Sequence, residues 1–241
     1  EKIVSLTAYD YQTATLFDQA GIDFLLVGDS VGNVVYGKED TLSVTVEDII
    51  RHTQAVARAC KQSLVVADMP FGSYQPSIEL AVTNASRFLS EGGAQAVKLE
   101  GGIPMAATIA RLVDVGIRVR GHVGLTPQWV NQMGGYRFQG KNEKERKRVF
   151  EDARAVEKAG AFAVVLECVE EELSKIITQE LRIPTIGIGS GEGCDGQILV
   201  SNDLLGLNVG HTPKFVKPLA NLKGIILETA LMYRKQVKGI S

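Results

Sequence analysis

The sequence has few cysteines, almost no net charge and no long apolar run. Cys60, Cys168 and Cys194 are odd in number and lack zinc-finger spacing, so reduced thiols in a cytoplasmic protein are expected. The formal net charge is −2, from 26 basic and 28 acidic residues, which gives no electrostatic reason to expect nucleic acid or an anionic membrane as a partner. No apolar run approaches the roughly 18 residues that a membrane span requires.

Short apolar runs typical of β-strands alternate with amphipathic helical patterns throughout the 241 residues. Strands are expected at 2–8, 23–29, 63–69, 94–100, 117–123, 161–167, 184–190 and 197–203, and helices at 45–60, 77–93, 144–160 and 222–237. Eight repeats in a chain of this length predict one parallel (β/α)8 TIM barrel, a single domain spanning 1–241. A doubly wound open sheet, for which about five or six strands suffice, is the alternative.

Two glycine-rich stretches resemble nucleotide-binding motifs without meeting their requirements. In "GNVVYGKE" (32–39), Glu39 stands where a P-loop needs Ser or Thr. "GEGCDG" (191–196) is followed by "QILV", which is typical of a strand and not of the helix that a dinucleotide site requires. The longest irregular stretch is 124–143, and a loop of that length in a compact domain is usually functional or mobile.

Four of the expected strands end on a carboxylate: Asp29, Asp68, Glu100 and Glu167. In a barrel these ends meet at one face, where their charges would repel one another unless a cation lay among them. Hard carboxylate oxygens suit Mg²⁺ better than Zn²⁺. Simpler explanations remain: Asp29 could occupy a surface turn, and Glu167 could lie in the first turn of the helix that follows.

Other polar residues are expected beside these carboxylates. Lys98 shares strand parity with Glu100, so both side chains are expected to face the barrel interior. There Lys98 could form a buried salt bridge or act as a Schiff-base lysine. His122 is either an active-site residue or a histidine that hydrogen-bonds a backbone carbonyl. Ser190 could serve a glycine-rich turn or contact a ligand, and Tyr9 and Asp10 could border the pocket or cap the first helix.

Ordered sequence blocks along almost the whole chain resemble the ketopantoate hydroxymethyltransferase family. They are "LTAYDY" (6–11), "LVGDSVG" (26–32), "VVADMPFGSYQ" (65–75), "VKLEGG" (97–102), "GHVGLTPQ" (121–128), "GGYRFQG" (134–140), "GIGSG" (187–191), "CDGQILV" (194–200) and "TPKFVK" (212–217). The resemblance implies a (β/α)8 barrel that uses Mg²⁺. It also implies transfer of a hydroxymethyl group from 5,10-methylenetetrahydrofolate to 3-methyl-2-oxobutanoate, giving 2-dehydropantoate for pantothenate and coenzyme A biosynthesis.

The resemblance also implies roles for individual residues. Asp29, Asp68 and Glu100 match the metal ligands, and Glu167 matches the proton acceptor. The residues that match the oxo-acid site are Asp29, Ser30, Asp68 and Lys98. Mg²⁺ would act as a Lewis acid that stabilises the charge of an enolate. The block around His122 also matches, with no definite role attached to it.

Two departures from the family pattern are present. The family usually begins with a helix before "KIV", so we expect an N-terminal helix to be missing from this chain. Arg118 and Arg120 replace residues that are commonly apolar or proline, and Arg120 would be an unusual buried cation. Family members form homo-oligomers, including decamers, which implies the same for this chain.

Three other functions remain open. The first is a Mg²⁺-dependent barrel enzyme of the isocitrate-lyase and phosphoenolpyruvate-mutase type, although the catalytic "KKCGH" motif of its lyases is absent from this sequence. The second is a Schiff-base aldolase that uses Lys98. The third is a barrel that binds a ligand without catalysis.

Overall fold

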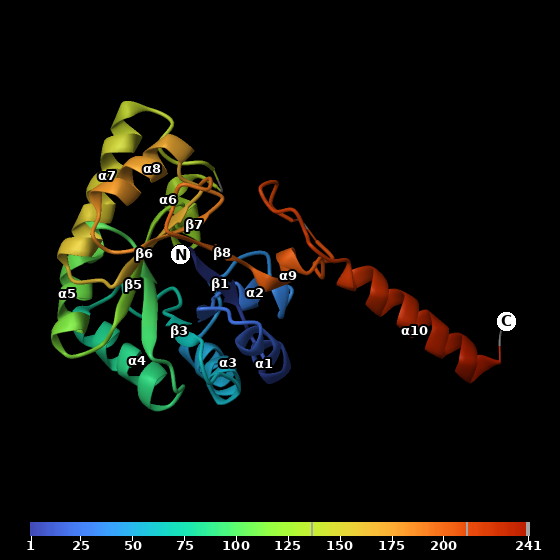
Figure 1. Ribbon diagram of the computed structural model, residues 1–241. Coiled ribbons are helices and arrows are strands. Elements are labelled where there is room, and N and C mark those ends of the chain that lie inside the picture. Colours follow the sequence, from blue (N-terminus) through green and yellow to red (C-terminus); the bar gives the residue numbers. More distant parts are fainter. Residues whose placement is uncertain (136, 211, 240–241) are drawn as a thin grey trace. The chain divides into compact units, whose positions relative to one another are not determined.

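Eight parallel strands close into a barrel in the computed structural model, which describes residues 1–135, 137–210 and 212–239 (Figure 1). The expected (β/α)8 architecture is therefore confirmed, and the open sheet is excluded. The strands are β1 (Ile3–Thr7), β2 (Phe24–Val27), β3 (Leu64–Asp68), β4 (Ala96–Glu100), β5 (Val119–Gly124), β6 (Ala163–Glu167), β7 (Thr185–Ile188) and β8 (Gly196–Leu199).

Helices connect all successive strands except β7 and β8, which the 189–195 loop joins. They are α1 (Tyr11–Gln19), α2 (Val31–Val34), α3 (Val46–Ala59), α4 (Ile78–Ser90), η1 (Ile103–Met105), α5 (Ala106–Asp114), η2 (Pro127–Trp129), α6 (Val130–Met133), α7 (Glu143–Lys158), α8 (Glu171–Glu180), α9 (Ser201–Leu204) and α10 (Leu222–Lys238). The four helices expected from periodicity are present as α3, α4, α7 and α10. Figure 1 shows α3, α4, α5 and α7 outside the strands.

Local sequence signals explain where the larger helices begin. The side chain of Thr45 accepts a hydrogen bond from the backbone N–H of Asp48, whose carboxylate accepts one from the N–H of Thr45, so α3 starts with a complete capping box. α4 and α7 each have a single side-chain cap: Ser77 accepts from the N–H of Leu80, and Asn142 accepts from the N–H of Glu145. Each cap pairs a backbone N–H in the first turn that has no partner within its helix.

An apolar layer fills the barrel interior beneath the polar strand ends. Its buried residues are Leu26, Val66, Ala96, Val165, Ile186 and Ile198. On β4, Ala96 belongs to this layer, and Lys98 and Glu100 share its side of the strand, while Val97 and Leu99 are buried on the opposite side. The parity expected for Lys98 is therefore confirmed, and the apolar layer separates the polar end of the barrel from the other end.

The last expected strand is shorter than its sequence pattern indicates. β8 ends at Leu199, and residues 201–204 form α9 instead of continuing to 203 as a strand. The pattern was misleading because Ser201 and Asp203 are buried polar residues of a helix and not the outward-facing residues of an alternating strand. The "GEGCDG" stretch leads into this strand, which confirms that it is not a dinucleotide fingerprint.

The described chain forms two compact units, Glu1–Ile198 and Leu199–Ser241. The first holds nearly all of the barrel strands. In the second, α10 carries seven large apolar side chains: Ile225, Ile226, Leu227, Leu231, Met232, Tyr233 and Val237. Within the described ranges, no helix has the length and apolar character needed to cross a membrane.

Candidate active site

The register of neighbouring strands brings the polar strand ends side by side. Asp68 of β3 lies opposite Lys98 of β4, and Glu100 of β4 lies opposite His122 of β5. Glu167 is the last residue of β6 and lies opposite Gly124. All of these charged side chains except Glu167 are nearly inaccessible to solvent, and the side chain of Glu167 is 17% exposed. The polar end of the barrel is therefore a dense cluster of buried ionisable groups.

Lys98 is the cation at the centre of this cluster. Its Nζ lies 2.9 Å from Oδ2 of Asp68 and 3.4 Å from Oε1 of Glu100. Burial lowers the pKa of Lys98, but the negative charges of Asp68, Glu100 and Asp29 outweigh it and raise the pKa above its ordinary value. A lysine held in its protonated form can pair with an anion but cannot attack a carbonyl, so the arrangement favours the ion pair over the Schiff base.

The two carboxylates that pair with Lys98 show the opposite effect of burial. Desolvation raises the pKa of Asp68, against the charge of Lys98, and Asp29 raises it further. Desolvation raises the pKa of Glu100 in the same way, with Asp29, Asp68 and Glu167 adding to it. Like charges gathered at low dielectric therefore destabilise one another here, and additional positive charge would relieve them.

Asp29 and Ser30 follow β2 on the turn that leads into α2. The backbone N–H of Asp29 donates to Oδ2 of Asp68 at 3.1 Å, so Asp29 is buried beside the cluster and does not lie in an exposed turn. Oγ of Ser30 lies 2.8 Å from the hydroxyl of Tyr9, which places Tyr9 at the same end of the barrel. Asp10 instead caps α1 by accepting a hydrogen bond from the N–H of Thr13 at 2.9 Å.

Gln128 joins three parts of the cluster and was not predicted from the sequence. Its Nε2 donates to Oδ2 of Asp29 and to the carbonyl of Met69, both at 2.9 Å. Its backbone N–H donates to Oε2 of Glu100 at 3.0 Å, and its Oε1 accepts from the hydroxyl of Tyr74 at 2.8 Å. The only signal for Gln128 and Tyr74 was their place in the blocks "GHVGLTPQ" and "VVADMPFGSYQ". Gln128 therefore links the segment after β5 to the carboxylates.

His122 lies between two carboxylates. Its Nε2 is 3.2 Å from Oε2 of Glu167, and its Nδ1 is 3.6 Å from Oε1 of Glu100. Burial and the positive charge of Lys98 lower the pKa of His122, although Glu167 opposes this shift. These contacts differ from the alternative in which His122 hydrogen-bonds a backbone carbonyl, and they connect Glu167 with the rest of the cluster.

Glu167 does not cap the helix that follows it. Glu170 is the N-cap of α8, and its carboxylate accepts from the N–H groups of Glu172 and Leu173 at 3.1 and 3.0 Å. Between the two glutamates, Cys168 has a φ of +48°, a left-handed conformation that is unusual for a residue other than glycine. This turn leaves Glu167 at the end of β6, facing His122, and gives the capping role to Glu170.

Ser190 and Arg118 are outside the group of contacts around Lys98. Oγ of Ser190 donates to the carbonyl of Leu166 at 2.7 Å and accepts from the N–H of Val169 at 3.0 Å, so it joins the ends of β6 and β7. Arg118 is exposed just before β5 begins. Arg120, two residues further on, is fully buried.

The carboxylates provide the type of ligand that Mg²⁺ prefers. Among the described residues, no group of three His, Cys, Asp or Glu side chains is close enough to coordinate one metal. Oδ1 of Asp68 is buried with no hydrogen-bond partner, which leaves one hard oxygen donor free for a cation. Gln128 hydrogen-bonds both Asp29 and Glu100, so the donor set matches Mg²⁺ in its chemistry, as hard carboxylate oxygens.

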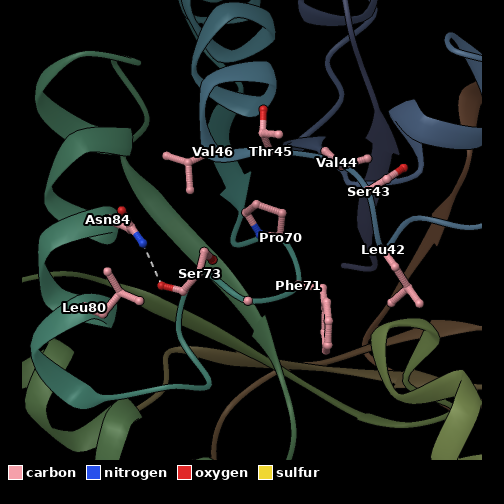
Figure 2. A pocket seen from close by; sticks show the side chains of 11 residues that line it. Leu42, Ser43, Val44, Thr45, Val46, Pro70, Phe71, Ser73, Leu80 and Asn84 are labelled. Carbon is pink, nitrogen blue, oxygen red and sulfur yellow. Dashed lines mark hydrogen bonds between the residues drawn. The ribbon is translucent and has the colours of Figure 1, made fainter.

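A pocket of about 430 Å³ lies between the 42–46 and 70–73 segments and α4 (Figure 2). The second segment begins two residues after Asp68. Nδ2 of Asn84 donates to the carbonyl of Ser73 at 2.7 Å, as Figure 2 shows, and this bond fixes one wall. None of the four strand-end carboxylates is among the described residues that line it, so this pocket is not the carboxylate cluster itself.

Comparison with known proteins gives consistent matches over the full length of the chain. The family model described as ketopantoate hydroxymethyltransferase matches residues 1–241. A 3-methyl-2-oxobutanoate hydroxymethyltransferase from Syntrophus aciditrophicus is 56% identical over 239 residues, covering 99% of this chain and 88% of the relative. One of the same name from Thermoanaerobacter sp. is 53% identical, with 99% and 87% coverage.

Solved structures with similar folds are more distant in sequence. A phosphoenolpyruvate phosphomutase from Streptomyces platensis superposes with a TM-score of 0.68 at 14% identity, over 100% of this chain and 84% of that one. A 2,3-dimethylmalate lyase superposes with a TM-score of 0.65 at 19% identity, with the same coverage. At such identities the likeness supports the barrel fold alone.

Proposed function

The chain belongs to the ketopantoate hydroxymethyltransferase family, and from this membership we propose that it transfers a hydroxymethyl group from 5,10-methylenetetrahydrofolate to 3-methyl-2-oxobutanoate. The product would be 2-dehydropantoate, for pantothenate and coenzyme A biosynthesis. The observation that carries the proposal is the contact between Glu167 and His122, next to the ion pairs of Lys98. This contact supports a role for Glu167 as the proton acceptor, beside a region suited to an anionic oxo acid.

Binding of the oxo acid is assigned to Lys98, Ser30, Asp29 and Asp68. Lys98 is protonated and buried, so its charge would offset the carboxylate of the substrate with little screening by water. The hydroxyl of Ser30 is held by Tyr9 and can donate a hydrogen bond to a substrate oxygen. The carboxylate of Asp68, which pairs with Lys98, would fix the direction of the ammonium group.

Asp29, Asp68 and Glu100 would hold Mg²⁺. The metal would supply a Lewis acid that lowers the energy of negative charge developing on the keto oxygen. Gln128 restrains the carboxylate of Asp29 and, through its backbone N–H, that of Glu100. Residues that orient metal ligands in this way typically change metal affinity or activity by about 10–100-fold when they are lost.

Glu167 would accept the proton from C3 of the oxo acid. The methylene carbon of the folate is bonded to two nitrogens, and breaking the first of these bonds opens it to an iminium. The electron pair left at C3 forms a bond to this carbon, and hydrolysis then breaks the second carbon–nitrogen bond. Water supplies the oxygen of the new hydroxymethyl group, and tetrahydrofolate leaves. The role needs a carboxylate that is not committed to a helix cap, and the capping of α8 by Glu170 leaves Glu167 available.

Deuterium exchange at C3 of 3-methyl-2-oxobutanoate tests this proposal directly, because it reports the first deprotonation without needing folate. The protein should catalyse exchange in D₂O with Mg²⁺ and lose that activity when EDTA removes the metal. Binding of the oxo acid without exchange would instead support a barrel that binds a ligand without catalysis. Trapping of Lys98 by borohydride in the presence of the oxo acid would support the Schiff-base alternative.

We also propose that the chain is a homo-oligomer that works in the cytoplasm. The apolar side chains of α10, such as Ile226, Leu227 and Leu231, would pack against a second copy, because burial of apolar surface between copies is favourable. Leu231→Glu should reduce the mass measured by light scattering, whereas Arg234→Glu on the same helix should change it less.

The proposed cytoplasmic location is supported by the thiols: Cys60, Cys168 and Cys194 are all free, as expected in a reducing compartment.

A further inference from the structure

Arg120 is a buried cation that the proposed chemistry does not yet use. It lies on β5 opposite Lys98 of β4, two residues before His122, and has the barrel-interior parity of both. Its exposure is 0%, and Nε, Nη1 and Nη2 all lack a hydrogen-bond partner within the described part of the chain. A buried, unpaired guanidinium is strongly unfavourable, so a purely structural role would not account for it.

The charge of Arg120 acts on the cluster from inside the barrel. Burial lowers the pKa of Arg120 to about 10, while the negative charge of Asp68 favours its protonated form, so it is charged at neutral pH. Asp68 pairs with Lys98 through Oδ2, and its Oδ1 is buried with no hydrogen-bond partner among the described residues, so Arg120 has no direct ion pair with it. At low dielectric such a charge influences neighbouring groups over several ångströms.

Charge balance indicates what this cation could stabilise. Asp29, Asp68, Glu100 and Glu167 carry four negative charges when ionised, and Lys98 and Arg120 carry two positive ones. A divalent cation would bring the region to neutrality, and the 2-oxo acid would then add a negative charge of its own. Without Arg120, the site with the divalent cation and the 2-oxo acid bound would hold one more uncompensated negative charge.

We propose that Arg120 makes the site selective for an anionic acceptor, by stabilising the carboxylate of the bound 2-oxo acid through the low-dielectric barrel interior. This inference rests on the proposed function, because it assumes that the site binds a 2-oxo acid. Arg120 is a specificity-determining residue in this arrangement, acting by charge and not as a metal ligand. Its unpaired nitrogens reduce stability in the absence of substrate and favour binding of a negatively charged one.

A comparison of two ligands that differ in charge tests the proposal. The affinities of 3-methyl-2-oxobutanoate and its neutral amide, 3-methyl-2-oxobutanamide, are measured by calorimetry with MgCl₂ for the wild type, Arg120→Met and Arg120→Lys. Arg120→Met should weaken binding of the acid on the order of tenfold, the scale of one charge pair in a protein interior, and change binding of the amide by less than about twofold. Arg120→Lys should retain most of the preference for the acid.

Thermal unfolding of the same variants separates selectivity from structure. Arg120→Met should unfold at the same or a higher temperature than the wild type, because it removes an unpaired buried charge. Arg120→Gln is a second neutral variant with the same expected loss of preference for the acid. If Arg120→Met loses affinity for the acid and the amide equally, so that the ratio of the two affinities stays that of the wild type, the assignment to Arg120 is wrong. Failure of the wild type to bind the acid overturns the proposed function with it.

Discussion

Nε2 of His122 lies 3.2 Å from Oε2 of Glu167, while Nδ1 of the same ring lies 3.6 Å from Oε1 of Glu100. One imidazole therefore connects the end of β6 with the end of β4. Because burial and Lys98 lower the pKa of His122, the ring is neutral at pH 7 and carries a single N–H. The His122 ring therefore lies close to both Glu167 and Glu100, and the shorter of the two distances is the one to Glu167.

Glu167→Gln is the most informative test of the proposed base. Glutamine preserves the size of the side chain and its contact with His122 but cannot accept a proton. Loss of a general base typically slows a reaction about 10²–10⁴-fold, and both C3 exchange and hydroxymethyl transfer should fall by this amount, because both begin with the same deprotonation. Exchange is followed by NMR in D₂O, and binding of Mg²⁺ and the oxo acid should remain close to that of the wild type.

Glu170→Gln is the matched control, because Glu170 caps α8 three residues further along the chain. It should lose roughly 0.5–2 kcal/mol of unfolding free energy and keep most of the exchange activity. Wild-type exchange in Glu167→Gln would show that the base is another group, with His122 the next to test.

Asp68→Asn should weaken Mg²⁺ binding by at least about 10–100-fold, because it removes one anionic oxygen from the proposed ligand set. Asparagine still accepts a hydrogen bond from the N–H of Asp29, so the variant should remain folded. The affinity is measured by calorimetry without substrate. Asp10→Asn, at the cap of α1, is the control and should bind Mg²⁺ as the wild type does. Undiminished affinity in folded Asp68→Asn would mean that the metal binds elsewhere.

Asp18 should make stability depend on pH in the acidic range. Burial alone would raise its pKa, but the backbone N–H groups of Lys61, Gln62 and Ser63, at 2.8 to 3.0 Å, lower it from 3.8 to about 2. A lowered folded-state pKa stabilises the fold above pH 3.8, and this contribution, about 2 kcal/mol, is lost as the pH falls toward 2.

Asp18→Asn should therefore be less stable than the wild type at pH 7, and the difference should shrink as the pH approaches 2. Urea unfolding at several pH values measures it. A constant difference between Asp18→Asn and the wild type across this range would mean that ionisation of Asp18 does not contribute.

The 124–143 segment should become resistant to protease when ligands bind. The segment contacts the carboxylate of Asp29 through Gln128. Gly134 and Gly135 have φ values of +70° and +111°, which favour glycine and suit points of bending. Tyr136 lies outside the described residues. Trypsin cleavage after exposed Arg137 should slow when Mg²⁺ and the oxo acid are present. Cleavage after exposed Lys214 is the internal control, and equal slowing at both sites, or at neither, would argue against a lid.

The sequence alone was sufficient for the fold class and for the polar end of the barrel. Alternation of strand and helix patterns is a local property, so it predicted the parallel barrel, the helices α3, α4 and α7, and the inward direction of Lys98 and Glu100. The boundary of β8 was less accurate, because a short apolar run followed by polar residues is compatible with both a strand and a helix start.

Contacts between distant parts of the chain were decided only by tertiary structure. Gln128 and Asp29 are 99 residues apart in sequence, and no local pattern could pair them before the barrel closed. The same holds for His122, whose place between two glutamates depends on the register of β4, β5 and β6. The sequence determined which side chains point inward, because side-chain direction follows the two-residue period of a strand. Which of them meet, and which are left unpaired as Arg120 is, followed from closure of the barrel.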